Sequence, residues 1–221
     1  MENLSRIVHY LILNSSSFPD IGLFNGKMGI SLFFFHYAKF SREEIYVEFA
    51  KLLLDQVMDD LTTYTPVNFQ DGLCRIGWGI EYLNRQKFIE VDTDEVLTEL
   101  DRQIINLDIR RITDYSIATG LEGIMHYWIS RCSNKNNVSF PFDTRYWNDL
   151  CHVLKEGRSA FSNPAWADMC LDYLSGNNKQ TCMLSIPTII RKHLIFNDLK
   201  EDTPLGLYNG LAGYGLNCIL R

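Results

Sequence analysis

"GLFNGKMG" occupies residues 22–29 and "GLYNGLAG" occupies residues 206–213, near the two ends of a chain of 221 residues. The two octets share five of their eight letters, and a sixth position exchanges Phe24 for Tyr208. A glycine-spaced stretch that returns in this way is a sign of internal repetition. The octets therefore predict a chain built from repeated structural units.

Further copies of the octet fit between these two. "GLCRIGWG" at residues 72–79 follows the same frame, and "GLEG" at residues 120–123 places another copy with its start at Ser116. The spacing of the starts leaves room for a degenerate copy near residue 161, where Asn163 and Pro164 signal a turn before a helical pattern. Five units of about 45 residues result, a length typical of helical-hairpin repeats.

Each unit is expected to contain two helices. Residues 45–61 and 97–107 carry apolar side chains at spacings of three and four, which predicts outer helices that bury one face. Ser41 and Glu44 have the spacing of a capping box for the first of these. The stretch after each glycine loop, such as "GISLFFFHYAKF" at residues 29–40, is apolar on several faces and predicts an inner helix.

The predicted fold class is therefore all-α. We expect a single domain over residues 1–221 in which an outer and an inner helix layer curve into an (α/α) toroid or an incomplete ring. Glycines suit the start of each inner helix, because a residue without Cβ permits a tight turn and a close approach of backbones.

Composition excludes several classes of partner. The net charge is −6 and no run of Lys or Arg exceeds two residues, which argues against a nucleic-acid surface. The N-terminal "MENLSRIVHYLILNSSS" lacks the basic start of a secretory signal, and no apolar run is long enough to span a bilayer. The six cysteines are scattered, so we expect reduced thiols. These observations predict a cytoplasmic protein without a membrane span.

The glycine loops resemble those of the lanthionine synthetase C-like proteins, whose toroids have GxxG loops at the start of the inner helices. The pieces that carry the resemblance are "NGKMGISLF" at residues 25–33 and "NGLAGYGL" at residues 209–216. The resemblance implies a peptide-modification pathway in which zinc holds a cysteine thiol of a precursor peptide as the thiolate nucleophile, which adds across a dehydrated residue. It implies a precursor peptide or a peptide-modifying enzyme as the partner.

The zinc ligands that the resemblance implies are incomplete in this sequence. The positions two residues ahead of each glycine pair are Phe24, Cys74, Ala118 and Tyr208. Cys74 alone fits a ligand position, and Ala118 and Thr119 stand where the family has a Cys-His pair. A catalytic zinc site needs three protein ligands. Cys74 is therefore the one candidate metal ligand of this loop pattern.

Cys74 and His126 are the candidate catalytic residues. The start of a helix and the neighbouring Arg75 would lower the pKa of the Cys74 thiol and make it reactive. His126 would face the central cavity and supply a ligand or a proton. The alternatives are a small core cysteine that fills a tight loop and a histidine whose hydrogen bonds are satisfied within an inner helix.

The candidate peptide-binding residues are Phe24, Trp78, Glu122 and Tyr208. Aromatic side chains at the start of inner helices can line a concave surface for an extended peptide, or they can fill the core. A set of carboxylates near the same helix starts also fits the paired acids of helical-toroid glycosidases, or simply the stabilisation of helix dipoles. These carboxylates are Asp71, Glu81, Glu122 and Asp168.

Two functional hypotheses follow. The first is a non-catalytic scaffold that binds a precursor peptide or a peptide-modifying enzyme and has a degenerate zinc site. The second is an active zinc-dependent cyclase that uses Cys74 with ligands from His126, Cys170 or a second subunit. Three residues at the end of the array, Tyr214, Leu216 and Ile219, predict a homodimer in which a second chain covers that end.

Overall fold

The computed structural model describes residues 2–133, 143–175, 184–190, 199–200 and 203–220. All regular elements in these ranges are helices, so the all-α prediction is confirmed. No helix of the described ranges is long and apolar enough to cross a membrane. The chain forms two compact units: unit 1 comprises Met1–Thr65 and Leu184–Arg221, and unit 2 comprises Pro66–Met183.

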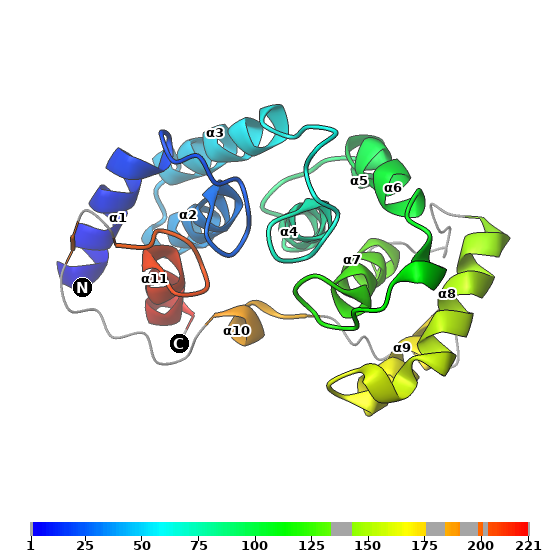
Figure 1. The fold of residues 1–221 in the computed structure, drawn as a ribbon. Helices are drawn as coiled ribbons and strands as arrows, with labels where there is room; N and C mark the ends of the chain where they lie inside the picture. The colour runs from blue at the N-terminus through cyan, green and yellow to red at the C-terminus, as the bar shows by residue number, and fades with distance from the viewer. Residues whose placement is uncertain (1, 134–142, 176–183, 191–198, 201–202, 221) are drawn as a thin grey trace. The chain divides into compact units, whose positions relative to one another are not determined.

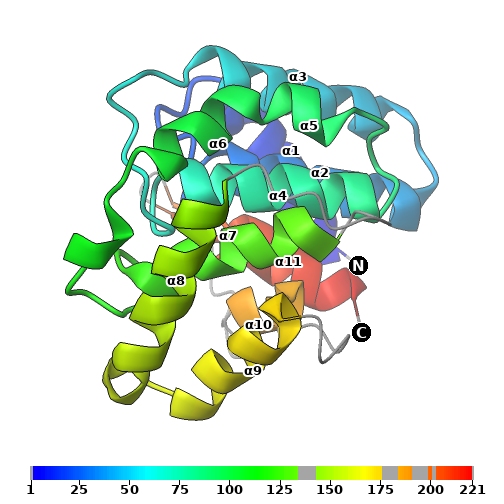
Figure 2. The same ribbon diagram turned by 90° about the vertical axis from the view of Figure 1, so that its right-hand side faces the viewer.

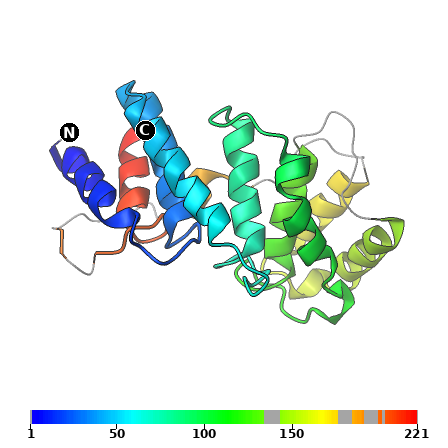
Figure 3. The ribbon, with the colours of Figure 1, turned by 90° about the horizontal axis from the view of Figure 1, so that it is seen from above.

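Unit 1 is organised around one central helix. Its described helices are α1 (Glu2–Ser15), α2 (Lys27–Ser41), α3 (Ile45–Asp59), α10 (Ile186–Ile189) and α11 (Leu211–Ile219). Figure 1 shows α2 between α3 and α11, and Figure 3 shows α1 lying lengthwise next to α11. The side chains of Phe33, Phe34 and Phe35 point in different directions and all three are buried. The helix predicted at residues 29–40 is thus present as α2 and is buried on several faces, as a helix that is apolar on several faces must be.

Unit 2 is built on a pair of packed helices. Its described helices are α4 (Leu73–Arg85), α5 (Thr93–Val96), α6 (Thr98–Ile105), η1 (Ile109–Arg111), α7 (Leu121–Ser133), α8 (Thr144–Glu156), η2 (Arg158–Ala160) and α9 (Pro164–Leu174). Figures 1 and 2 show α4 beside α7, with α5 and α6 along α4. A Cβ on Gly77 would lie 2.3 Å from the Tyr127 ring, so this glycine permits the close packing of α4 on α7.

Four glycine loops share one backbone conformation. In each, the N–H group that follows a glycine at the helix start donates to the carbonyl oxygen seven residues earlier, at 2.8–2.9 Å. The donor and acceptor pairs are Lys27 with Asp20, Leu73 with Pro66, Leu121 with Asp114, and Leu211 with Pro204. This bond defines which residues are equivalent: Gly26, Gly72, Gly120 and Gly210.

The predicted frame of the second octet is wrong. Gly72 is equivalent to Gly26, not to Gly22, so the true copy begins four residues earlier, at Asn68. The glycines that suggested the frame, Gly77 and Gly79, lie within α4, where Gly77 serves helix packing. The position equivalent to Phe24 and Tyr208 is thus occupied by Gln70 in this loop, and Cys74 lies inside the helix.

Neighbouring glycine loops are joined by a backbone hydrogen bond between equivalent positions. The Tyr208 N–H group donates to the Phe24 carbonyl at 3.0 Å in unit 1, and the Gln70 N–H group donates to the Ala118 carbonyl at 2.8 Å in unit 2. A Cβ on Gly206 would lie 2.1 Å from the Phe24 carbonyl oxygen. The first and last octets of the sequence therefore lie side by side in unit 1.

The expected capping box at the start of α3 is also wrong. Ser41 is the last residue of α2, and Arg42 follows it in the left-handed conformation with φ 63°. The N-cap of α3 is Glu44, which makes no side-chain capping bond. The chain reverses between α2 and α3 at residues 41–44. Ser41 and Arg42 therefore belong to the end of α2 and not to the start of α3.

We predict that Gly206→Ala lowers the free energy of unfolding by about 2–3 kcal/mol, because the new Cβ must push apart two backbones that are in contact. Urea unfolding followed by circular dichroism measures the effect. Asn25→Ala, an exposed change beside the same contact, is the control and should have little effect. Equal stability of Gly206→Ala and the parent would contradict the described loop contact.

Candidate functional site

Cys74, the candidate nucleophile and metal ligand, is the second residue of α4 and is fully buried. Burial raises the pKa of the Cys74 thiol well above its usual value, and the nearby Asp101 carboxylate acts in the same direction. The Arg75 guanidinium lies over the Phe69 ring, 4.8 Å from its centroid, and donates to the Gln70 carbonyl at 2.7 Å. The expected activation of the thiol by Arg75 and the helix start is therefore wrong, because burial and Asp101 outweigh both.

The described donor set does not fit a zinc ion. Within the described ranges, no three His, Cys, Asp or Glu side chains come together in a way that could hold a metal. The positions two residues before the helix-start glycines are Phe24, Gln70, Ala118 and Tyr208, and none of these side chains is a typical zinc ligand. Asp71 directly precedes Gly72, but it belongs to no group of three ligand side chains in the described ranges. The five described cysteines are not joined to one another, and Cys182 lies outside the described residues.

His126 lies in α7 with 5% of its surface exposed. Its ring packs against Phe69 and Trp166, with ring centroids 5.9 Å and 4.8 Å away, and its Nδ1 atom has no hydrogen-bond partner within the described chain. Burial lowers the pKa of His126 to about 4, so the ring is neutral at pH 7. The 3.9 Å separation between Nε2 and Glu122 Oε1 is then a contact of a neutral ring with a carboxylate, not an ion pair.

Glu122 is the more accessible member of this pair. It lies in the first turn of α7, its side chain is 18% exposed, and burial raises its pKa. The structure thus brings two of the predicted site residues, Glu122 and His126, together on one helix face.

Phe24 and Tyr208 form the second grouping of predicted site residues. Their rings stack with centroids 5.3 Å apart and planes inclined by 22°. Tyr208 is 43% exposed and Phe24 is half-buried, so the pair presents an aromatic surface on the two joined glycine loops. Trp78 differs: it is fully buried and stacks on Tyr82 at 5.4 Å, which leaves no surface for a peptide.

Two more of the carboxylates named in the sequence, Glu81 and Asp168, have arginine partners. Glu81 is fully buried and accepts a hydrogen bond from Arg131 at 2.6 Å. Asp168 forms an exposed ion pair with Arg158 at 2.5 Å. Neither is available as one of the paired acids of a glycosidase, since each is neutralised by an arginine.

The end of the array is covered within unit 1. Leu216 is fully buried, and α11 packs against both α1 and α2. The expectation that Leu216 lies on an uncovered face is therefore wrong, whereas Tyr214 and Ile219 are half-buried. The homodimer itself stays a prediction.

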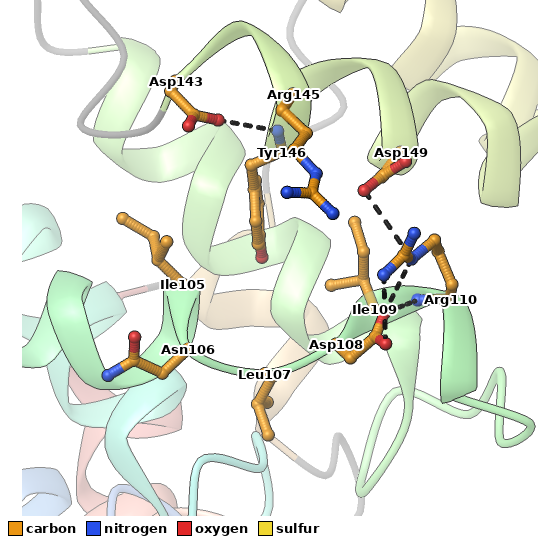
Figure 4. Close-up of a pocket in the computed structure, with 10 residues that line it drawn as sticks. All are labelled: Ile105, Asn106, Leu107, Asp108, Ile109, Arg110, Asp143, Arg145, Tyr146 and Asp149. Atoms are coloured by element: carbon orange, nitrogen blue, oxygen red, sulfur yellow. Dashed lines mark hydrogen bonds and ion pairs between the residues drawn. The ribbon is translucent and has the colours of Figure 1, made fainter.

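Sequence reasoning missed a pocket of about 270 Å³ where the end of α6, η1 and the start of α8 meet (Figure 4). Aspartate and arginine side chains from "DIRR" at residues 108–111 and "DTR" at residues 143–145 surround it. These clusters of opposite charge are the signal in the sequence that could have indicated the pocket. No family model, curated protein or solved structure matches the chain.

We predict that Cys74 resists alkylation. Iodoacetamide at pH 8 should label the exposed Cys218 in the native protein and reach Cys74 only after unfolding, because a buried thiol with a raised pKa supplies little thiolate. Peptide mass spectrometry identifies the labelled residues.

Cys74→Ser should leave the zinc content of untagged protein unchanged in elemental mass spectrometry. If the parent holds one equivalent of zinc and Cys74→Ser does not, the conclusion that Cys74 is not a metal ligand is contradicted.

We predict that His126 makes the fold sensitive to acid. The unfolded histidine takes up a proton below its ordinary pKa of 6.5, whereas the folded one does so only near 4, so stability present above pH 6.5 is lost as the pH falls toward 4. The loss amounts to at most about 1.4 kcal/mol per pH unit. Burial, with Lys39, also lowers the pKa of His36 to about 4 and adds a similar loss.

His126→Phe keeps an aromatic ring and should remove one histidine's share of this pH dependence, while stability at pH 7 stays equal or rises. Urea unfolding at pH 7.0, 5.5 and 4.5 measures the slope, and the exposed His9→Gln controls for the loss of a histidine. An unchanged slope in His126→Phe would show that the ring is not buried in the neutral form.

Proposed function

We propose that this chain is a helical-toroid scaffold of the lanthionine synthetase C-like type that binds an extended peptide and does not cyclise it. The observation that carries the proposal is the exposed, stacked pair of Phe24 and Tyr208 on two joined glycine loops. The partner would be a precursor peptide, or a peptide-modifying enzyme that presents one, in the cytoplasm.

The direction of the loop bonds supports the toroid. In unit 2 the loop before α4 donates to the loop before α7, which is the next glycine loop along the chain. In unit 1 the loop before α11, the last of these loops, donates to the loop before α2, the first. The last loop thus bonds to the first loop in the same way that the loop before α4 bonds to the next one along the chain. This relation is expected in an array of repeats that closes into a ring.

The chemistry of the aromatic pair supports a peptide ligand. Two stacked rings offer apolar area with one phenol hydroxyl at its edge, and tyrosine is common among the residues that dominate binding energy. The loops are already held by backbone bonds, so little conformational entropy is lost on binding. Asn25 and Asn209 follow the two rings and are exposed, and asparagine amides can both donate to and accept from a peptide backbone.

The environment of Cys74 supports binding over the zinc-dependent cyclase. A nucleophile or metal ligand must reach its substrate as a thiolate, whereas the Cys74 thiol is fully buried and its pKa is raised. The loop positions two residues before the helix-start glycines carry aromatic, amide or methyl side chains, which do not add typical zinc ligands.

We predict that Tyr208→Ala weakens peptide binding at least about tenfold, because it removes the exposed half of the aromatic pair. The probe is a phage-displayed library of linear 12-residue peptides, selected on the parent protein. Synthetic fluorescent copies of the selected peptides are then measured by fluorescence anisotropy on both proteins.

Tyr64→Ala is the matched control, since Tyr64 is a 93% exposed tyrosine of the same unit outside the joined loops. Binding that is equal in Tyr208→Ala and the parent, or that is lost equally in Tyr64→Ala, would contradict the proposed surface.

A further inference from the structure

The pocket at the start of α8 holds an unusual balance of charge. Its lining includes three aspartates and two arginines, a net charge of −1, together with apolar side chains from the end of α6 and from η1. Figure 4 shows the charged side chains around its opening. The kind of ligand that the pocket accepts depends on which of these charged side chains already have partners within the protein.

The aspartates of the pocket are engaged. Arg110 binds both oxygens of Asp108, at 2.9 Å and 3.2 Å, and lies 3.7 Å from Asp149. Asp143 caps α8 by accepting the Tyr146 N–H group at 2.8 Å. Asp108 is the most engaged, because it also accepts the Arg110 N–H group at 3.3 Å and pairs with Arg111 at 3.4 Å. Asp143 and Asp149 have fewer contacts and keep acceptor capacity, because a carboxylate has about four lone-pair sites.

Arg145 is the cation of the lining that has no ion pair within the described part of the chain. Figure 4 shows its guanidinium directed over the pocket, between Tyr146 and Asp149. The planar fork of a guanidinium matches a carboxylate in a bidentate arrangement. The pocket therefore offers one uncompensated site for an anionic group, bordered by acceptors.

Part of the wall below Arg145 is apolar, although the lining as a whole exposes more polar than apolar surface. The Tyr146 ring is buried at 7% exposure, and its hydroxyl accepts a hydrogen bond from Trp128 Nε1 at 3.2 Å. Ile105 and Ile109 complete this wall. A volume of about 270 Å³ lies just below the range of pockets for drug-sized ligands, so it suits a group of about one amino-acid residue.

We propose that this pocket binds the carboxy-terminal residue of a peptide, with the carboxylate on Arg145, the amide N–H on Asp149 or Asp143, and the side chain against Tyr146. An N-acylated amino acid is the smallest molecule that has all three features. A dianion such as phosphate fits less well, because the lining has a net negative charge. The inference rests on the proposed peptide-binding function but uses residues of unit 2.

The test is a titration followed by ¹H–¹⁵N NMR, with N-acetyl-leucine, N-acetyl-leucinamide, 4-methylpentanoate and inorganic phosphate as probes. We expect saturable shifts of Arg145 and Tyr146 with N-acetyl-leucine, and affinities at least about tenfold weaker for the amide and for Arg145→Gln. Arg145→Lys should recover part of the affinity. Lys155→Gln, which removes the same charge from an exposed site of α8, should bind like the parent.

Several outcomes would overturn the inference. Equal binding of the acid and its amide, or unchanged binding in Arg145→Gln, would exclude the carboxylate contact. Equal binding of 4-methylpentanoate would assign the pocket to simple carboxylic acids, and stronger binding of phosphate would assign it to phosphorylated ligands. Tyr208→Ala should bind N-acetyl-leucine normally, so failure of this pocket and failure of the aromatic surface can be told apart.

Discussion

The structure of unit 1 depends on the close approach of two backbones that leaves no space for a side chain. Gly206 lies against the carbonyl of Phe24 and the backbone of Asn25, so the loop before α11 can reach the loop before α2 only without a Cβ. Because the contact is between main chains, the side chain at the bonded position is free to vary. It is aromatic in unit 1 and is Gln70 or Ala118 in unit 2, which is why only unit 1 offers a stacked aromatic surface.

Unit 2 has joined glycine loops as well, and it also contains a buried arginine. Arg131 of α7 binds Glu81 of α4 at 2.6 Å and Asp101 of α6 at 2.7 Å, and all three are buried. A buried arginine is tolerated when carboxylates and further hydrogen bonds compensate the loss of hydration, and removal of one partner then leaves an unpaired charge. Glu81, one of the carboxylates that suggested catalysis in the sequence, thus helps to link three helices.

The helices were predictable from the sequence because their signals are local: apolar periodicity marked α3 and α6, and Asn163 before Pro164 marked the start of α9. The frame of the second octet was not, since a glycine that permits helix packing, such as Gly77, reads like one that permits a turn. The candidate site residues were recognised individually, but their contacts depend on tertiary structure. Nothing near Phe24 in the sequence shows that it stacks on Tyr208, nor that His126 is buried behind Trp166.

The chain order of the two units bears on synthesis at the ribosome. All of unit 2 comes from one continuous stretch, Pro66–Met183, whereas unit 1 combines residues that precede and follow it. The apolar surface of α2 is therefore translated early but meets α11 only after the whole of unit 2 has been made. During that interval its phenylalanines lack part of their cover, and exposed apolar surface of this kind promotes aggregation of nascent chains. Unit 2 can fold as it emerges, while completion of unit 1 must wait for the last helix.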